Sequence, residues 1–198
     1  MQETRGDDLE EEIWIRARTG DAESFGEIFD IHHNRVYGQA LRLARNIHDA
    51  EDVTALTFLE LWRRRTSVDS VDGSVIGWLL VTTNYVVRNL ERTRRRHSAA
   101  MRRLPQPFES ADHALRVQEA IDGESAKVAM RRAFRQLSTT DQDILTLCVL
   151  QELSEAQASS VLGIARGTVK SRLSRAKRRL ADIIELSDQP MLVEGNPS

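Results

Sequence analysis

The chain has a single cysteine, Cys148, only 5% aromatic residues and no long apolar run among its 198 residues. One cysteine excludes an internal disulfide, and five histidines without metal-ligand spacing leave no metal site to assemble. No stretch reaches the roughly 18–20 apolar residues that are needed to cross a membrane. The acidic, polar N-terminus also differs from the basic and apolar start of a signal peptide. We therefore expect a soluble, cytoplasmic protein that holds no metal and does not insert into a membrane.

Sequence patterns of catalysis are missing as well. The chain has no Gly-rich phosphate loop, no Ser-His-Asp arrangement and no isolated carboxylate pair. Cys148 lies in the apolar run 144–150, where a small core residue is favoured over a redox sensor. We expect no enzymatic activity and no cofactor.

The net charge of −2, from 28 basic and 30 acidic residues, conceals two basic clusters. Residues 88–96 contain five arginines and one glutamate, and residues 165–180 contain seven basic residues and no acid. Two such segments, far apart in sequence, indicate two contact points on a polyanion. The alternative is that each is a solvated helix end with a favourable macrodipole.

Apolar residues recur at helical spacing along nearly the whole chain, which predicts an all-α fold. In the first part, the spacing predicts helices over residues 21–43, 49–64 and 75–96, with a turn-rich break over 66–74. The second of these helices is expected to turn the following side chains inward: Val53, Leu56, Phe58, Leu59 and Trp62.

Residues 98–125 contain Pro105 and Pro107 and few apolar residues, which predicts a flexible linker. The chain is then two small helical domains joined by this linker. The predicted division is an acidic N-terminal segment (1–20), a first helical domain (21–97), the linker (98–125), a second helical domain (126–186) and a tail (187–198).

A helix-turn-helix is predicted within the second domain. Residues 154–157 (SEAQ) form a capping-box pattern that opens a short helix. Gly163 follows as the left-handed residue that ends this helix, and a second helix begins near residue 167. A helix, a tight glycine turn and a second helix is the geometry that places the second helix in the major groove of DNA.

The second helix of this motif separates apolar from basic residues. An apolar stripe recurs every three or four residues, at Val169, Leu173, Ala176, Leu180 and Ile183. A stripe against the core leaves the basic face open to phosphates and the first turns open to base edges. The residues predicted to bind DNA here are Arg166, Thr168, Lys170, Ser171, Arg172, Arg175, Lys177 and Arg178.

Three stretches carry a resemblance to a known family: residues 25–65, which end in AEDVTALTFLELWRRR, residues 76–96 (IGWLLVTTNYVVRNLERTRRR) and residues 133–180. They resemble the bacterial RNA polymerase sigma factors of the extracytoplasmic-function (ECF) group, a small two-domain branch of the sigma-70 family. The last stretch alone would also suit a response-regulator output domain. The first two stretches make the resemblance specific.

The resemblance implies roles for three helices. The helix from Asp49 to Arg64 would dock on the clamp helices of the largest polymerase subunit through Asp49, Glu51, Asp52, Ala55, Leu56 and Leu59. The helix after it would read and melt the promoter −10 element through Asn84, Tyr85, Arg88, Asn89, Arg92 and Arg95. The helix-turn-helix would read the −35 element close to the flap of the second-largest subunit.

The implied function is that of a sigma factor, which binds core RNA polymerase, recognises promoter DNA and nucleates strand opening. Many members of the family are also held by an anti-sigma factor. Two other classes compete with this interpretation: a stand-alone helix-turn-helix regulator and a protein–protein adaptor with basic surfaces. The first domain favours the sigma interpretation, since a simple repressor has no use for a second basic helix after a docking helix.

Overall fold

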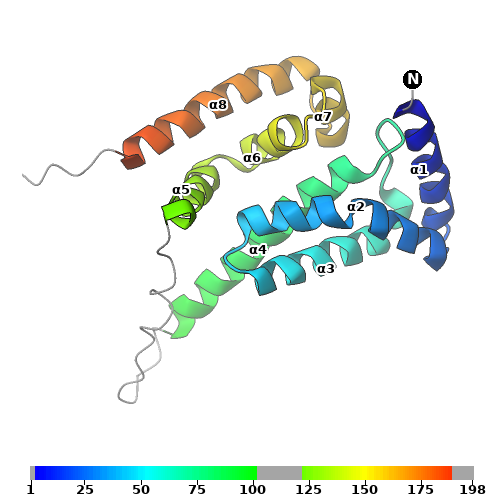
Figure 1. Ribbon diagram of the computed structural model, residues 1–198, viewed down its shortest axis with the longest axis horizontal. Coiled ribbons are helices and arrows are strands. Elements are labelled where there is room, and N and C mark those ends of the chain that lie inside the picture. Colours follow the sequence, from blue (N-terminus) through cyan, green and yellow to red (C-terminus); the bar gives the residue numbers. More distant parts are fainter. Residues whose placement is uncertain (1–2, 102–121, 189–198) are drawn as a thin grey trace, which may run out of the picture.

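A computed structural model describes residues 3–101 and 122–188, and these residues form eight α-helices (Figure 1). In chain order the helices are α1 (Glu3–Arg18), α2 (Ala22–Leu43), α3 (Ile47–Arg64), α4 (Ile76–Met101), α5 (Asp122–Gln136), α6 (Thr139–Leu145), α7 (Glu155–Leu162) and α8 (Arg166–Asp188). No strand occurs within these described ranges, where the nearest approach is one isolated bridge between Val71 and Ser74. The all-α prediction is confirmed.

Polar caps fix where the helices of the first module begin. The Asp21 carboxylate accepts hydrogen bonds from the backbone N–H groups of Glu23 and Ser24, which opens α2. The Asn46 side chain accepts one from Asp49 N at 2.8 Å, which opens α3. The sequence placed this start at Asp49, and the structure corrects it to Ile47 because Asn46 is the capping residue.

The inward face of α3 differs from the prediction at two positions. Val53 and Phe58 are buried, and Trp62 is half-buried, as expected. Leu56 and Leu59, however, are 46% and 51% exposed. Two threonines, Thr54 and Thr57, take the buried places beside Val53 and Phe58, and each bonds a carbonyl of its own helix. The leucines three residues apart therefore share the opposite face of α3.

The acidic N-terminal segment forms a helix that packs into the core of the first module. Ile13, Trp14 and Ala17 of α1 are at most 3% exposed and belong to the same apolar cluster as Ile28 and Leu61. The Trp14 indole N–H donates to Val68 O at 3.3 Å. Burying these side chains stabilises α1 against the loop that connects α3 to α4.

The helix-turn-helix forms as predicted. The Ser154 Oγ accepts from Gln157 N at 3.2 Å, and the Gln157 side chain accepts from Ser154 N at 2.8 Å, which completes the capping box. Gly163 ends α7 in the left-handed region, at φ 63° and ψ 30°. The Ser159 hydroxyl donates to Ile164 O at 2.6 Å and closes the turn before α8.

The glycine at this corner gives a stability prediction. Open space surrounds Gly163, so a Gly163→Ala change meets no clash but places a Cβ in the left-handed region. We expect a loss of about 1 kcal/mol in the free energy of unfolding, measured by urea denaturation. Gly26, also in open space but inside α2, is the matched control: Gly26→Ala should stabilise the chain by about 0.5–1 kcal/mol. If both substitutions raised the free energy of unfolding, or both lowered it, this account would be contradicted.

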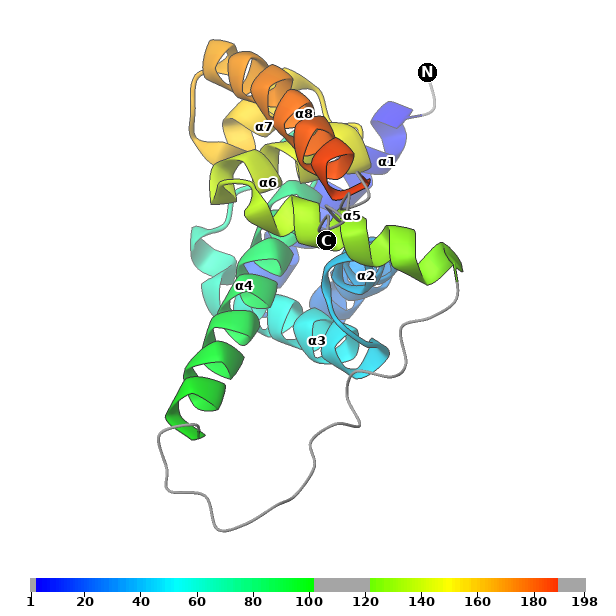
Figure 2. The ribbon, with the colours of Figure 1, turned by 90° about the vertical axis from the view of Figure 1, so that its left-hand side faces the viewer.

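The two modules pack directly on each other. Helix α4 contacts α6 and α7, and α5 contacts α2 (Figure 2). Leu79 and Leu80 of α4 share one apolar cluster with Ile144 and Leu147 of the second module. Most of the predicted linker lies outside the described residues, while α4 continues to Met101 and α5 begins at Asp122.

Candidate nucleic-acid interface

The rotation of α8 is set by its apolar stripe. Val169 and Ala176 are fully buried, and Leu173, Leu180 and Ile183 are half-buried against the rest of the module. The opposite face is consequently turned to solvent. Of the eight side chains predicted to bind DNA, Thr168 and Arg172 are half-buried and the other six are exposed, namely Arg166, Lys170, Ser171, Arg175, Lys177 and Arg178.

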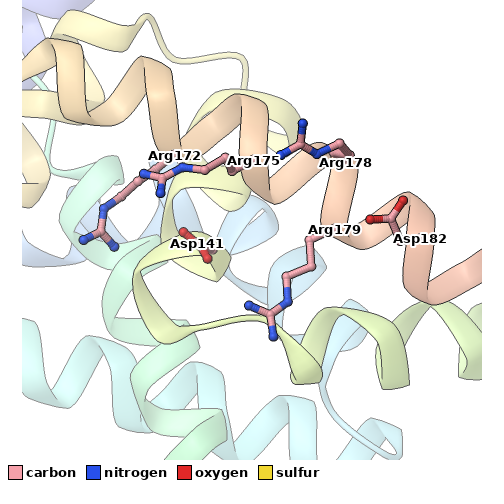
Figure 3. Close-up of a pocket in the computed structure, with 6 residues that line it drawn as sticks. All are labelled: Asp141, Arg172, Arg175, Arg178, Arg179 and Asp182. Atoms are coloured by element: carbon pink, nitrogen blue, oxygen red, sulfur yellow. The ribbon is translucent and has the colours of Figure 1, made fainter.

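Four arginines of α8 line a shallow pocket of about 390 Å³ (Figure 3). Arg172 and Arg175 extend in the same direction from the helix, whereas Arg179 points toward α6. The remaining lining residues are Arg178, Asp141 and Asp182. Four guanidinium groups against two carboxylates leave an excess of positive charge, which suits a phosphate backbone. Arg179 was not among the predicted residues, although its place in the basic run 165–180 could have indicated it.

The six α4 residues predicted to contact the −10 element are not presented together. Tyr85 is 54% exposed, and Arg92 and Arg95 are also exposed. Asn89 is half-buried and accepts a hydrogen bond from Arg92 at 2.7 Å. Asn84, in contrast, is only 1% exposed. The exposed members therefore form a surface to which Asn84 does not contribute in this arrangement.

Asn84 and Arg88 are both bonded to the second module. Asn84 Nδ2 donates to Asp143 Oδ1 at 2.8 Å and to Thr146 Oγ1 at 3.0 Å. Arg88 Nη1 donates to the same Asp143 oxygen at 3.1 Å and to Gln142 Oε1 at 3.2 Å. A carboxylate of α6 thus accepts hydrogen bonds from two α4 side chains, Asn84 and Arg88, while Tyr85, Arg92 and Arg95 of the same helix stay exposed.

The polymerase-docking residues predicted on α3 divide into an exposed set and one buried residue. Glu51, Asp52, Ala55, Leu56 and Leu59 are exposed along one side of the helix. The two carboxylates come first along α3 and the two leucines follow, so that the surface is acidic at one end and apolar at the other. Such a surface suits another protein better than it suits DNA, whose phosphates the carboxylates would repel.

Asp49 lies apart from that surface, at 4% exposure, in a two-pronged ion pair with the guanidinium of Arg94. The hydrogen bonds from Arg94 hold the pKa of the Asp49 carboxyl below its ordinary value, against the opposing effect of burial. The pair ties the start of α3 to the basic end of α4. In this structure the Asp49 carboxylate is therefore occupied by Arg94 and does not belong to the exposed surface of α3.

No cluster of three or more metal-ligating side chains occurs among the residues described. Burial raises the pKa of the Cys148 thiol, and its side chain packs against the core. A raised pKa lowers the thiolate fraction, which fits the predicted structural role of Cys148. None of the helices in the described ranges is long and apolar enough to cross a membrane.

Comparison with known proteins matches both modules. Residues 28–97 match the family described as Sigma-70 region 2, and residues 127–180 match Sigma-70 region 4. The ECF RNA polymerase sigma factor SigE of Mycolicibacterium smegmatis is 34% identical over 164 residues, which are 81% of this chain and 62% of the relative. The ECF RNA polymerase sigma factor SigM of Mycobacterium tuberculosis is 30% identical over 167 residues, 83% of this chain and 79% of the relative.

Solved structures show the same fold. CnrH, in complex with the cytosolic domain of CnrY, aligns at a TM-score of 0.61 and 19% identity, covering 92% of this chain and all of that one. The sigma factor RpoE of Bartonella quintana, in complex with the anti-sigma factor NepR, aligns at 0.55 and 20% identity, covering 85% of this chain and all of that one.

Region 2 and region 4, in this order on one chain, define a protein of the sigma-70 class with two helical modules. The chain belongs to the sigma-70 family, within the group of ECF RNA polymerase sigma factors. It spans 62% of the length of the SigE relative and 79% of the length of the SigM relative.

Proposed function

We propose that this chain is a promoter-specificity subunit: it binds core RNA polymerase, recognises promoter −35 and −10 elements and nucleates strand opening. The observation that carries this proposal is that one chain combines the exposed apolar and acidic face of α3 with the exposed basic face of α8. A stand-alone DNA reader accounts for the second surface only. The family of the chain accounts for both.

The basic face of α8 supports duplex recognition. Arginines at positions 172, 175, 178 and 179 would neutralise phosphates and fix the register of the helix on the DNA. Arg166, Thr168, Lys170 and Ser171 lie on the first turns of α8, the part of a recognition helix that meets base edges. We therefore propose that the second module binds the upstream element.

The exposed part of α4 supports the downstream role. Tyr85 offers an accessible ring on which an unpaired base can stack, and Arg92 and Arg95 offer charge to the backbone beside it. Capturing an extruded base offsets the free energy of lost pairing and stacking, so that opening needs no nucleotide hydrolysis by this chain. The chain itself would therefore act as a binding subunit and not as an enzyme.

The partners follow from these surfaces. The α3 face would meet the clamp helices of the largest polymerase subunit, and the second module would lie near the flap of the second-largest subunit. An anti-sigma factor is a further proposed partner, because RpoE, a sigma factor of the same fold, is named in complex with one. An inhibitor of this kind would compete with polymerase or DNA for these same surfaces.

The experiment that tests the proposal combines the full chain with bacterial core RNA polymerase. We expect co-elution on a sizing column, and enrichment of duplexes with two conserved blocks from a random-sequence DNA library. Run-off transcription from an enriched duplex should require both the chain and core polymerase. Duplex binding without association with core polymerase would instead assign the chain to the stand-alone regulators.

A further inference from the structure

The basic end of α4 is held to α3 through Arg94. Within residues 92–101, Arg94 alone is partly buried, and the other nine residues are exposed. Its guanidinium makes the two-pronged ion pair with Asp49, which lies in the first turn of α3 and is 4% exposed. Beyond this pair, residues 95–101 continue α4 for roughly 10 Å at 1.5 Å per residue, past the start of α3 (Figure 1). The direction of this exposed end therefore depends on the contact between Asp49 and Arg94.

Carboxylates surround the Arg94 guanidinium. The hydrogen bonds with Asp49 raise the pKa of Arg94, against the opposing effect of burial. The charges of Asp52, one turn further along α3, and of Glu91, one turn earlier on α4, act in the same direction as Asp49. Arg95 is exposed, whereas the charge of Arg94 is balanced within the protein. Arg94 is thus suited to holding α4 in place and not to binding a phosphate.

The same pair fixes the rotation of α4 about its own axis. Successive side chains of an α-helix are turned by about 100°, so that positions two or nine residues apart point in roughly opposite directions. Tyr85 and Arg92 lie nine and two positions before Arg94. Both are exposed, Tyr85 at 54%. With Arg94 held against α3, Tyr85 and Arg92 are consequently turned to the outer side of α4.

The chemistry of the pair makes it a directional contact. An arginine and a carboxylate that share two parallel hydrogen bonds fix an angle as well as a distance, which a single point charge does not. The Asp49 backbone is itself fixed, because its N–H donates to the Asn46 side chain that caps α3. Leaving the buried Asp49 carboxylate unpaired would be costly. The paired arrangement is strongly favoured for this reason, and it restricts the orientation of α4 on α3.

We propose that Asp49 is a positioning residue for recognition of the −10 element: through Arg94 it sets the direction and rotation of the basic end of α4, so that Tyr85 and Arg92 meet the unpaired strand. This inference rests on the proposed function and adds a residue to it. In this role Asp49 contacts neither DNA nor polymerase, which differs from the docking role that the sequence resemblance implied. Helix α3 then carries the polymerase-docking face and also sets the geometry of the −10 reader.

The substitution Arg94→Lys tests this role without removing a charge. Lysine keeps the charge and the helix propensity of arginine but lacks its planar fork, so that the two-pronged contact is lost while Asp49 retains a cation nearby. In the complex with core polymerase, we expect the variant to bind a single-stranded −10 oligonucleotide about tenfold more weakly, because the displaced end of α4 loses about one charge-assisted hydrogen bond. The affinities of the chain for core polymerase and for a −35 duplex should stay within about twofold of the parent, since those contacts lie elsewhere.

Rescue and control variants separate positioning from a general loss of stability. Adding Asp49→Glu to Arg94→Lys lengthens the carboxylate side chain by one methylene group, which restores an ion pair with the lysine. This double variant should bind the −10 oligonucleotide within about threefold of the parent, because the two changes compensate each other. The matched control is Arg64→Lys, since Arg64 pairs with Glu60 inside α3. The control should leave the affinity for the oligonucleotide unchanged.

A distance measurement tests the anchoring of α4 independently of DNA. Nitroxide labels are attached to cysteines at two exposed positions, Arg63→Cys on α3 and Ala100→Cys on α4, with Cys148→Ala to remove the native thiol. Double electron–electron resonance on the full chain should give one narrow distribution of distances between the labels. Adding Arg94→Lys should broaden or shift this distribution, and the further change Asp49→Glu should return it toward that of the parent.

Three results would overturn the inference. Unchanged oligonucleotide binding by Arg94→Lys would mean that the pair does not position the −10 reader. Equal losses of oligonucleotide, duplex and polymerase binding would mean that the pair only stabilises the fold. The same distance distribution with arginine and with lysine would mean that the pair does not hold α4. A parent complex that does not bind the −10 oligonucleotide would instead contradict the proposed function, and the distance measurement would still decide whether Asp49 holds α4.

Discussion

Reversing two charges on α8 should abolish duplex binding by the chain. Arg175 and Arg178 are exposed and line the arginine pocket, so that Arg175→Glu with Arg178→Glu replaces two phosphate-binding groups by two that repel phosphate. Losing charge-assisted hydrogen bonds of about 1.5–3 kcal/mol each predicts an affinity loss on the order of 100-fold or more. Fluorescence anisotropy with a labelled promoter duplex measures the effect.

The salt dependence of DNA binding gives a second test of the same expectation. The logarithm of the parent's affinity should fall steeply with the logarithm of salt concentration, and the slope should be smaller by about two in the double variant. The control is Arg42→Glu with Arg132→Glu, two exposed arginines on α2 and α5 that give the same change in net charge. An equal loss in both double variants would mean that total charge, and not the α8 face, determines binding.

A second large effect is expected on α3. Leu56 and Leu59 are 46% and 51% exposed, so that Leu56→Asp with Leu59→Asp should leave the fold intact. Burying two carboxylates in an apolar contact costs more binding free energy than burial of the two leucines contributes. We therefore expect at least a 100-fold loss of affinity for core polymerase. Co-elution with core polymerase measures it, while circular dichroism and the thermal midpoint report on the fold.

The chain offers a closely matched control for this change. Leu9 and Ile15 of α1 are 58% and 56% exposed, and both lie outside the residues assigned to any partner. Leu9→Asp with Ile15→Asp therefore places two aspartates at helix positions of similar exposure, and it changes net charge and helix propensity much as the α3 double variant does. Normal polymerase binding by this control, beside loss in the α3 variant, would assign docking to α3. Normal polymerase binding by both double variants would mean that Leu56 and Leu59 of α3 do not belong to the docking surface.

Local sequence patterns were sufficient to predict the helix-turn-helix. The capping box of Ser154 and Gln157 and the left-handed Gly163 depend on residues three to five positions apart, which the sequence displays directly. The same holds for the apolar stripe of α8, since its rotation follows from spacing alone. The exposure of the basic residues there was predictable for that reason.

The features that the sequence did not predict depend on contacts between residues far apart in the chain. Asn84 and Asp143 are 59 positions apart, and nothing in the local pattern around Asn84 indicates that a carboxylate of the second module covers it. On α3, buried threonines displaced Leu56 and Leu59 to the outer face, a choice made by the neighbouring helices α2 and α4. Hydrophobic spacing alone does not distinguish a buried leucine from an exposed one.

Helix α1 lies ahead of the residues that match region 2, yet its contacts determine how α4 begins. Glu10 bonds His32 at 2.7 Å and accepts from Val75 N at 3.1 Å, one residue before α4 starts. Arg18 donates to Thr66 O and pairs with Asp69 in the same connecting loop. The matched range, which begins at residue 28, thus excludes a helix that packs into the same core. Under the proposed function, we expect relatives that share region 2 but differ in the leading helix to orient α4 differently and so to prefer different promoters, without any change in the residues proposed to contact DNA.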